Sequence, residues 1–310
     1  MGVLDASDLA FIEKFENCGF QKACWNHEAH VRMAWIQLSR SNSFHAGLDC
    51  IREGIKRFNN AVSGVGYHET VTVVFAQLIH FRMEQFPSNH TWASFLAANT
   101  DLLAKAPPIL SVYYSSELLA SIESKVQFVK PDRRALPPIG RVRLASPDDA
   151  TSVLGIYAPY VKNSAVSFEL TVPTESDMRD RISSYLAHAP WLVFEIEGKI
   201  VGYAYASKHR AREAYQWTVE VSAYVDPEFQ KMGIARLLYS RLFGELQNLG
   251  FRQALAGIAL PNEASVGFHE TLGFIPVGVF RKIGFKMGGW HDVGWWQRPI
   301  SNLNIGKIAG

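Results

Sequence analysis

The feature that most restricts the fold of this chain is a change of hydrophobic periodicity across one proline-rich segment. Residues 130–140 read KPDRRALPPIG, with three prolines and three basic residues. Proline removes a backbone donor and restricts the residue before it, so this composition is typical of a linker. We therefore expect two domains, residues 1–129 and 140–300, joined by a linker at 130–139 and followed by a tail at 301–310.

Before the linker, apolar residues recur at the spacing of an α-helix. In the segment AHVRMAWIQLSR, Val31, Trp35 and Leu38 fall on one face, and the segments at 46–58 and 70–83 repeat this pattern. Several amphipathic helices with short connections predict a small all-α bundle over about residues 5–128.

After the linker, strand and helix patterns alternate. The segment WLVFEIEGKIVGYAYA reads as two strands around a turn at Glu197-Gly198, and Ser146-Pro147 and Thr174 read as helix starts. A further helix is expected from about residue 233 to 249, ended by Gly250.

The composition excludes several classes of protein. Apolar residues make up 48% of the 310 residues, charged residues make up 19%, and the net charge is +2, so the chain is globular without a basic excess for nucleic acid. The first ten residues lack the pattern of a signal peptide, and we find no apolar run of the ~20 residues that span a bilayer. The cysteines, Cys18, Cys24 and Cys50, are odd in number. We expect a cytoplasmic protein without a membrane or nucleic-acid partner and without a structural disulfide.

The segment VSAYVDPEFQKMGIARLL, residues 221–238, joins a strand that ends at Asp226-Pro227 to a helix through a turn that contains Gly233. Backbone N–H groups at a helix start have no partner inside the helix, and the helix dipole favours an anion there. Gly233 has no Cβ and so allows a close approach of the anion. The turn predicts an anion site, although a plain strand–turn–helix with a solvated basic turn has the same pattern.

The motif QKMGIA at 230–235 resembles the signature of the GNAT superfamily of acyl-CoA N-acyltransferases, Gln/Arg-x-x-Gly-x-Gly/Ala after the fourth strand. The segments WTVEVSAYV, ALPNEASVGFHETLGF and GFKMGGWHDVGWWQ resemble the phosphinothricin and methionine sulfoximine N-acetyltransferase branch. The resemblance covers about residues 140–300 and implies a mixed, mostly antiparallel central sheet flanked by helices. The whole chain is then an α+β protein of two domains.

The resemblance implies acetyl-CoA as the co-substrate. Its pyrophosphate would lie in the turn before the helix, and its pantetheine arm would hydrogen-bond to a strand edge and to Asn262, which is also a good helix start. The residues assigned to acetyl-CoA in this way are Ala223, Tyr224, Val225, Gln230, Lys231, Met232, Gly233, Ile234, Ala235, Arg236, Asn262 and Ser265.

Glu220 is the candidate general base, because the matching glutamate of the branch has that role. It shares a strand face with Ser222 and Tyr224. An amine attacks a thioester only as the free base, and an ordinary glutamate with a pKa of about 4.3 is a weak base. Burial and an ordered water can make it effective. An exposed glutamate on a strand face is the alternative.

Direct attack on the thioester produces an oxyanion, for which we expect the Tyr224 N–H as the donor. His269 stands on the helix where many relatives carry a tyrosine, so it is a candidate acid for the leaving thiolate. The same position also fits a core histidine that is bonded to the backbone.

The acceptor site is predicted from the resemblance and from charge. A small amino acid needs a cation for its carboxylate, and an arginine clamp suits that group. Lys208, Arg210 and Arg212 precede the catalytic strand; Phe168, Glu169, Trp290 and His291 match positions around the acceptor pocket of the branch. A solvated basic loop is equally consistent with the three cations.

The first domain contains two His/Glu-containing segments, WNHEAHVRMAW and GYHETVT. His27 and His30 are spaced i, i+3 on one helical face, and His68 and Glu69 begin another helix. We expect either a divalent metal site inside the bundle or ordinary caps and core histidines.

These patterns favour an acetyl-CoA-dependent N-acetyltransferase that acts on a small amino-acid-like amine such as phosphinothricin or methionine sulfoximine. A protein or peptide acetyltransferase with a recruiting bundle, and an acetyl-CoA sensor without turnover, remain alternatives. A homodimer through the acetyltransferase domain is also expected.

Overall fold

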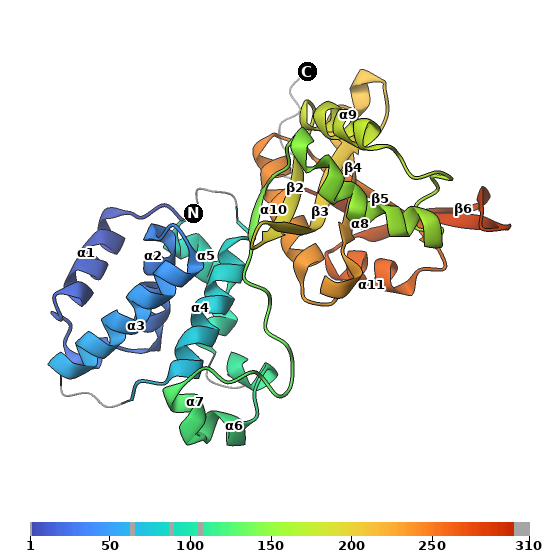
Figure 1. Ribbon diagram of the computed structural model, residues 1–310. Helices are drawn as coiled ribbons and strands as arrows, with labels where there is room; N and C mark the ends of the chain where they lie inside the picture. The colour runs from blue at the N-terminus through green and yellow to red at the C-terminus, as the bar shows by residue number, and fades with distance from the viewer. Residues whose placement is uncertain (1, 63–65, 87–89, 105–107, 301–310) are drawn as a thin grey trace. The chain divides into compact units, whose positions relative to one another are not determined.

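The computed structural model describes residues 2–62, 66–86, 90–104 and 108–300, so the predicted tail at 301–310 lies outside the described residues. The chain divides into two compact units, Met1–Gly140 and Arg141–Gly310. The first unit is helical, and the second combines a sheet with helices (Figure 1). The prediction of an α+β chain with an all-α first part is confirmed.

The helices of the first unit coincide with the periodic segments. The longest are α2, α3 and α4, and the side chains of Asn26 and Ser43 cap the first two of them by accepting the N–H groups of Ala29 and Ala46. The α-helices are α1 (Ala6–Glu16), α2 (His27–Arg40), α3 (Phe44–Ala61), α4 (Glu69–Met83), α5 (Trp92–Ala98), α6 (Ser116–Ala120) and α7 (Ile122–Val126). Three segments of 3₁₀ helix are Lys22–Cys24, Thr100–Leu103 and Ile109–Val112.

The proline-rich segment belongs to the helical unit by its contacts. Leu136 and Ile139 pack against the core around Trp35, and the Gln77 side chain donates to the Pro137 carbonyl at 2.7 Å. His80 Nε2 lies 3.0 Å from the Gly140 carbonyl oxygen. The segment is therefore fixed along the surface of this unit up to Gly140.

The second unit contains a seven-stranded sheet in the order β1-β2-β3-β4-β5-β7-β6. Of the neighbouring strands, only β4 and β5 pair in parallel among the described residues. The strands are β1 (Arg141–Leu144), β2 (Trp191–Ile196), β3 (Lys199–Lys208), β4 (Thr218–Val225), β5 (Gln253–Leu260), β6 (Ile275–Lys286) and β7 (Gly289–Pro299). The sheet is mixed and mostly antiparallel, as the sequence predicts.

Helices cover both faces of this sheet (Figure 1). On one face lie α8 (Ala150–Asn163) and α9 (Glu175–Leu186), whose apolar side chains pack with those of Trp191 and Tyr203. On the other face lies α10 (Ile234–Asn248), where Ile234 contacts Gly202 of β3. The short helix α11 (Glu263–Thr271) follows β5.

Local signals set the element boundaries. The β2–β3 turn has positive φ at both Glu197 (48°) and Gly198 (83°), as a two-residue hairpin turn requires. Ser146 forms a capping box with Asp149, but the residues after it form a 3₁₀ segment, Pro147–Asp149, and the α-helix begins at Ala150. The expected helix start is thus displaced by one turn.

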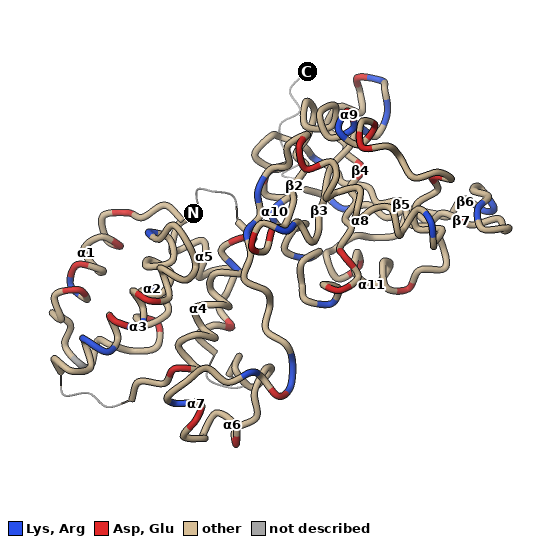
Figure 2. The backbone as a smooth tube through the Cα atoms, viewed as in Figure 1, with Lys and Arg blue, Asp and Glu red and all other residues tan. Residues whose placement is uncertain are grey.

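Acidic and basic residues are interspersed along both units (Figure 2), in agreement with the small net charge of +2. Within the described ranges, no helix is both long and apolar enough to cross a membrane.

Candidate active site

The parallel strands β4 and β5 are paired along only part of their length. Their register covers Thr218↔Gln253, Val219↔Ala254 and Glu220↔Leu255, whereas β5 pairs with β7 over its whole length. Beyond Glu220 the two strands separate, and the β5-facing edge of β4 is left without a strand partner in the described structure. A separated edge of this kind offers backbone groups to an extended ligand.

The hydrogen-bond ladder between β3 and β4 determines which backbone groups of β4 face the gap between β4 and β5. The Asp226 N–H donates to the Val201 carbonyl at 2.9 Å, and backbone groups in an antiparallel pair alternate in direction. Ala223 and Val225 therefore direct their N–H groups toward the gap, and Tyr224 directs its N–H toward Tyr203. The expectation that the Tyr224 N–H meets the oxyanion is wrong for this reason.

The turn after β4 leads into a helix whose first N–H groups have no side-chain cap. Gly233 is the N-cap of α10 with φ 88°, and Lys231 also has a positive φ of 62°. The N–H groups of Ile234, Ala235 and Arg236 have no hydrogen-bond partner within the described residues, and the first helical bond is Leu237 N–H to Gly233 O. Successive free amides at a helix start form a site for a phosphate group.

Other predicted cofactor residues lie in this turn and at the start of α11. Gln230 is exposed and donates to the Tyr160 hydroxyl at 3.0 Å, and that hydroxyl donates to the Val225 carbonyl at 2.7 Å. Asn262 caps α11 by accepting the Ser265 N–H at 3.1 Å, which is the helix-start role that the sequence also allows. The exposed Lys231 and the half-buried Met232 complete the turn.

Glu220 has a partner that sequence reasoning missed. His209 Nδ1 lies 2.8 Å from Glu220 Oε1, and the two side chains are 15% and 35% exposed. His209 follows the end of β3, next to the predicted cations. Because Ser207 is opposite Glu220 in the β3–β4 register, a residue just beyond it can reach the carboxylate. The Glu220 carboxylate is thus half-buried, is oriented by His209, and is still reached by water.

Glu220 lies on the sheet face that carries a cluster of tyrosines. The rings of Tyr203 and Tyr224 lie 5.3 Å apart, and those of Tyr157 and Tyr224 lie 5.1 Å apart. Burial raises the pKa of Tyr203 and of Tyr224 well above the usual value, so both stay neutral. The tyrosines make this face largely aromatic, and the guanidinium of Arg181 lies 6.0 Å from the centre of the Tyr157 ring.

His269 is buried, and both of its ring nitrogen atoms have partners. Nδ1 lies 2.8 Å from the Ser265 carbonyl oxygen, and Nε2 lies 3.2 Å from the Tyr239 hydroxyl. Burial lowers the pKa of His269 and raises that of Tyr239, so both are neutral and the imidazole accepts a hydrogen bond from the Tyr239 hydroxyl. This arrangement corresponds to the core histidine that the sequence left as an alternative.

The predicted acceptor residues fall into two groups. Phe168 lies in the loop between α8 and α9 and packs on Gly284 of β6, and Glu169 pairs with Arg181 at 2.8 Å. The buried Lys286 holds this loop by donating to the Val161 and Ser167 carbonyls, each at 2.7 Å. The cations Lys208, Arg210 and Arg212 are exposed, as are Phe168 (37%) and Trp290 (61%), and His291 Nε2 lies 3.0 Å from the Lys286 carbonyl oxygen.

The residues predicted to hold a metal in the first unit have other partners, so the structure does not support this site. Nε2 of His27 lies 2.8 Å from the Leu102 carbonyl, and Nε2 of His68 lies 2.9 Å from that of Leu119. Glu69 is held by Arg52 at 2.9 Å and by the Tyr67 hydroxyl, and His30 Nδ1 contacts the Asn26 carbonyl. No group of three or more metal-ligating side chains converges anywhere in the described part of the chain.

A separated pair of parallel strands, followed by an uncapped helix start, is the architecture of an acyl-CoA-dependent acyltransferase. Comparison with known protein families agrees with this: the sequence model of the acetyltransferase (GNAT) domain family matches residues 142–295. The chain belongs to this family of N-acetyltransferases. Residues 1–141 lie outside that match.

Two curated relatives resemble the second unit. Phosphinothricin N-acetyltransferase of Streptomyces viridochromogenes is 39% identical over 172 residues, which cover 56% of this chain and 92% of that protein. The L-methionine sulfoximine/L-methionine sulfone acetyltransferase of Salmonella typhimurium is 33% identical over 160 residues, or 51% of this chain and 94% of that protein.

A solved structure gives the same result. The phosphinothricin acetyltransferase of Sinorhizobium meliloti in complex with AcCoA is 38% identical with a TM-score of 0.52, and the match covers 54% of this chain and 92% of that one. The family predicted from the sequence is therefore confirmed.

Proposed function

We propose that this chain transfers the acetyl group of acetyl-CoA to the amino group of a small amino-acid-like acceptor. The proposal rests on two neighbouring features. β4 separates from β5 beyond Glu220, and the turn that follows β4 leads to the free amides of Ile234, Ala235 and Arg236. The pyrophosphate would lie at those amides, and the pantetheine arm would follow the edge at Ala223 and Val225.

Glu220 is the general base in this proposal. It takes a proton from the acceptor ammonium, directly or through one water, and the free amine then attacks the thioester carbonyl carbon. His209 fixes the carboxylate through the 2.8 Å contact between Nδ1 and Oε1. As the C–N bond forms, the carbonyl oxygen becomes an oxyanion, for which the gap-facing N–H groups of Ala223 and Val225 are the candidate donors.

The reaction ends when the C–S bond breaks, the new amide nitrogen loses its remaining extra proton, and the thiolate of coenzyme A takes a proton. His269 remains our candidate for a residue on this proton path, with the neutral Tyr239 hydroxyl as its hydrogen-bond donor. Because Nε2 of His269 accepts a hydrogen bond from Tyr239 and carries no proton, the pair must rearrange before it can protonate a thiolate.

The acceptor class is proposed from the relatives, whose names specify phosphinothricin and methionine sulfoximine or sulfone. Two features of this chain are compatible with such an acceptor. The tyrosines on the same sheet face as Glu220 suit its small side chain, and the exposed cations Lys208, Arg210 and Arg212 can pair with its carboxylate.

Thiol release from acetyl-CoA, measured with phosphinothricin, methionine sulfoximine and a set of peptide amines, tests the proposal. We expect turnover with at least one of the two amino-acid analogues. Turnover with peptide amines alone would favour the protein acetyltransferase, and binding of acetyl-CoA without turnover of any acceptor would favour the sensor.

We also propose a homodimer through the β6–β7 hairpin. Apolar side chains along this hairpin are exposed, at 52% for Phe280, 55% for Ile283 and 63% for Met287. Such a row of apolar side chains is typical of an interface. A monomer in sedimentation at micromolar concentration would refute this proposal.

A further inference from the structure

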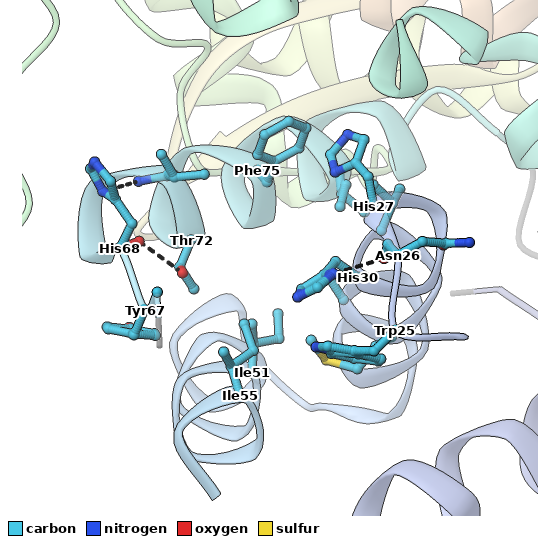
Figure 3. A pocket seen from close by; sticks show the side chains of 16 residues that line it. Trp25, Asn26, His27, His30, Ile51, Ile55, Tyr67, His68, Thr72 and Phe75 are labelled. Carbon is cyan, nitrogen blue, oxygen red and sulfur yellow. Dashed lines mark hydrogen bonds between the residues drawn. The ribbon is translucent and has the colours of Figure 1, made fainter. Parts of the chain in front are cut away.

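The first unit contains a cavity that acetyl transfer does not use. It lies between α2, α3 and α4 and has a volume of about 320 Å³ (Figure 3). Its lining is mostly apolar and aromatic, and includes Trp25, Val31, Ile51, Ile55, Val71 and Phe75. Volumes from ~300 Å³ upward are typical of sites for small organic molecules.

The described lining of this cavity contains no Lys, Arg, Asp or Glu. The charge of the neighbouring Glu69 is compensated by Arg52, and its carboxylate also accepts a hydrogen bond from the Tyr67 hydroxyl. The lining itself offers a carboxylate or phosphate no cation in return for its lost hydration, and the nearby Lys56 ammonium lies over the Tyr67 ring, 4.7 Å from its centroid. Both acetyl-CoA and a zwitterionic amino acid are therefore unsuited to the cavity.

One end of the cavity carries the polar atoms that a ligand can use. His30 Nδ1 lies 2.8 Å from the Asn26 carbonyl, which accepts a hydrogen bond only from a protonated Nδ1. Burial lowers the pKa of His30, so its imidazole is neutral and Nε2 is a free acceptor. In Figure 3 this edge of the ring points into the cavity.

Trp25 lies beside His30 at the same end, with ring centroids 4.2 Å apart. Its indole nitrogen is buried and has no hydrogen-bond partner among the described residues, so Trp25 contributes its ring, not its N–H group, to the lining. Across the cavity, the Thr72 hydroxyl donates to the His68 carbonyl at 3.0 Å, so it too can only accept from a ligand. Nε2 of His30 and the Thr72 hydroxyl oxygen are therefore the acceptors that the lining offers to a ligand.

We propose that this cavity binds a neutral, largely apolar small molecule with one hydrogen-bond donor, which meets Nε2 of His30 beside the Trp25 ring while its apolar part contacts Ile51, Ile55 and Phe75. This inference goes beyond acetyl transfer and makes the first unit a ligand-binding module. It does not depend on the acetyltransferase proposal.

A pair of fluorescent probes tests the inference on the full chain. N-phenyl-1-naphthylamine is neutral and apolar with one N–H donor, and 8-anilino-1-naphthalenesulfonate has the same rings plus an anion. We expect saturable fluorescence enhancement with the neutral probe and binding of the sulfonate that is at least tenfold weaker. Absence of saturable binding of the neutral probe, or equal affinity for the sulfonate, would overturn the proposal.

Two variants locate the binding. Ile55→Trp fills the cavity and should abolish binding of the neutral probe, whereas Ile122→Trp, the same change at a position that is 80% exposed in the same unit, should leave it unchanged. His30→Leu removes the acceptor and should weaken binding about five- to tenfold. If Ile55→Trp does not fold, His30→Leu alone decides, because unchanged affinity in that variant refutes the site.

Discussion

Glu220→Gln is the substitution that most sharply tests the proposed chemistry. Glutamine keeps the shape of the side chain and can still contact His209, but it cannot take a proton from the acceptor. General-base catalysis contributes roughly 10²–10⁴-fold to a rate. Because the Glu220 side chain is 35% exposed, water can replace part of its function, so we expect the lower half of that range.

We therefore predict that kcat falls by about 10²–10³-fold, equivalent to ~3–4 kcal/mol of activation free energy. The affinity for acetyl-CoA should stay within about twofold, because the proposed contacts with the co-substrate are backbone groups of the β4 edge and the α10 start. Thiol release measures kcat, and calorimetry measures the affinity. The control is Glu197→Gln in the β2–β3 turn, which should keep full activity. A Glu220→Gln enzyme with unchanged kcat would refute the assignment of the base.

Two further predictions concern histidines. His209→Phe keeps an aromatic ring beside Tyr215 but removes the contact with Glu220, so kcat should fall by roughly tenfold with unchanged acetyl-CoA affinity. The control Tyr215→Phe should keep its activity. An unaffected kcat in His209→Phe would show that the contact is dispensable. Burial lowers the pKa of His80 and of His269 below the ordinary 6.5, so the unfolded chain binds more protons and stability should fall as the pH drops below 6.5 toward the lowered values. Urea unfolding from pH 7.5 to 5 measures this loss, and His80→Gln should reduce the slope; a stability independent of pH in this range would contradict the burial of these rings.

Much of the fold follows from local signals that the sequence carries. The apolar spacing predicts α2, α3 and α4, and the Glu197-Gly198 turn between the two strands is present with both residues at positive φ. The glycine of the motif at 230–235 marks the N-cap of α10, because only the left-handed conformation leads from the turn into that helix.

The features that the sequence could not predict depend on partners that are distant in the chain. His27 bonds to a carbonyl 75 residues away, so its i, i+3 spacing from His30 carried no information about a metal. The direction of the Tyr224 N–H follows from the β3–β4 register, and the contact between His209 and Glu220 follows from the same register. If β3 and β4 had been aligned as an antiparallel pair from the sequence, His209 could have been predicted as a neighbour of Glu220.

Lys286 is a further example, since it holds the loop that carries Phe168 and Glu169 from more than a hundred residues away. The cavity of the first unit is equally invisible in the sequence, because its apolar lining residues have the same helical spacing as core residues. Only the packing of three helices shows that they surround a space.

The central claim is that the free amides at the start of α10 bind the pyrophosphate of acetyl-CoA, and calorimetric titration of acetyl-CoA into the full chain tests it most directly. Gly233→Ala adds a Cβ at a residue with φ 88°, and the control Gly198→Ala adds one at φ 83° in a turn with open space around it. We predict one binding site per chain, retained in Gly198→Ala and weakened at least tenfold in Gly233→Ala. No heat of binding with the unmodified chain, or equal affinities in the two variants, would contradict the account.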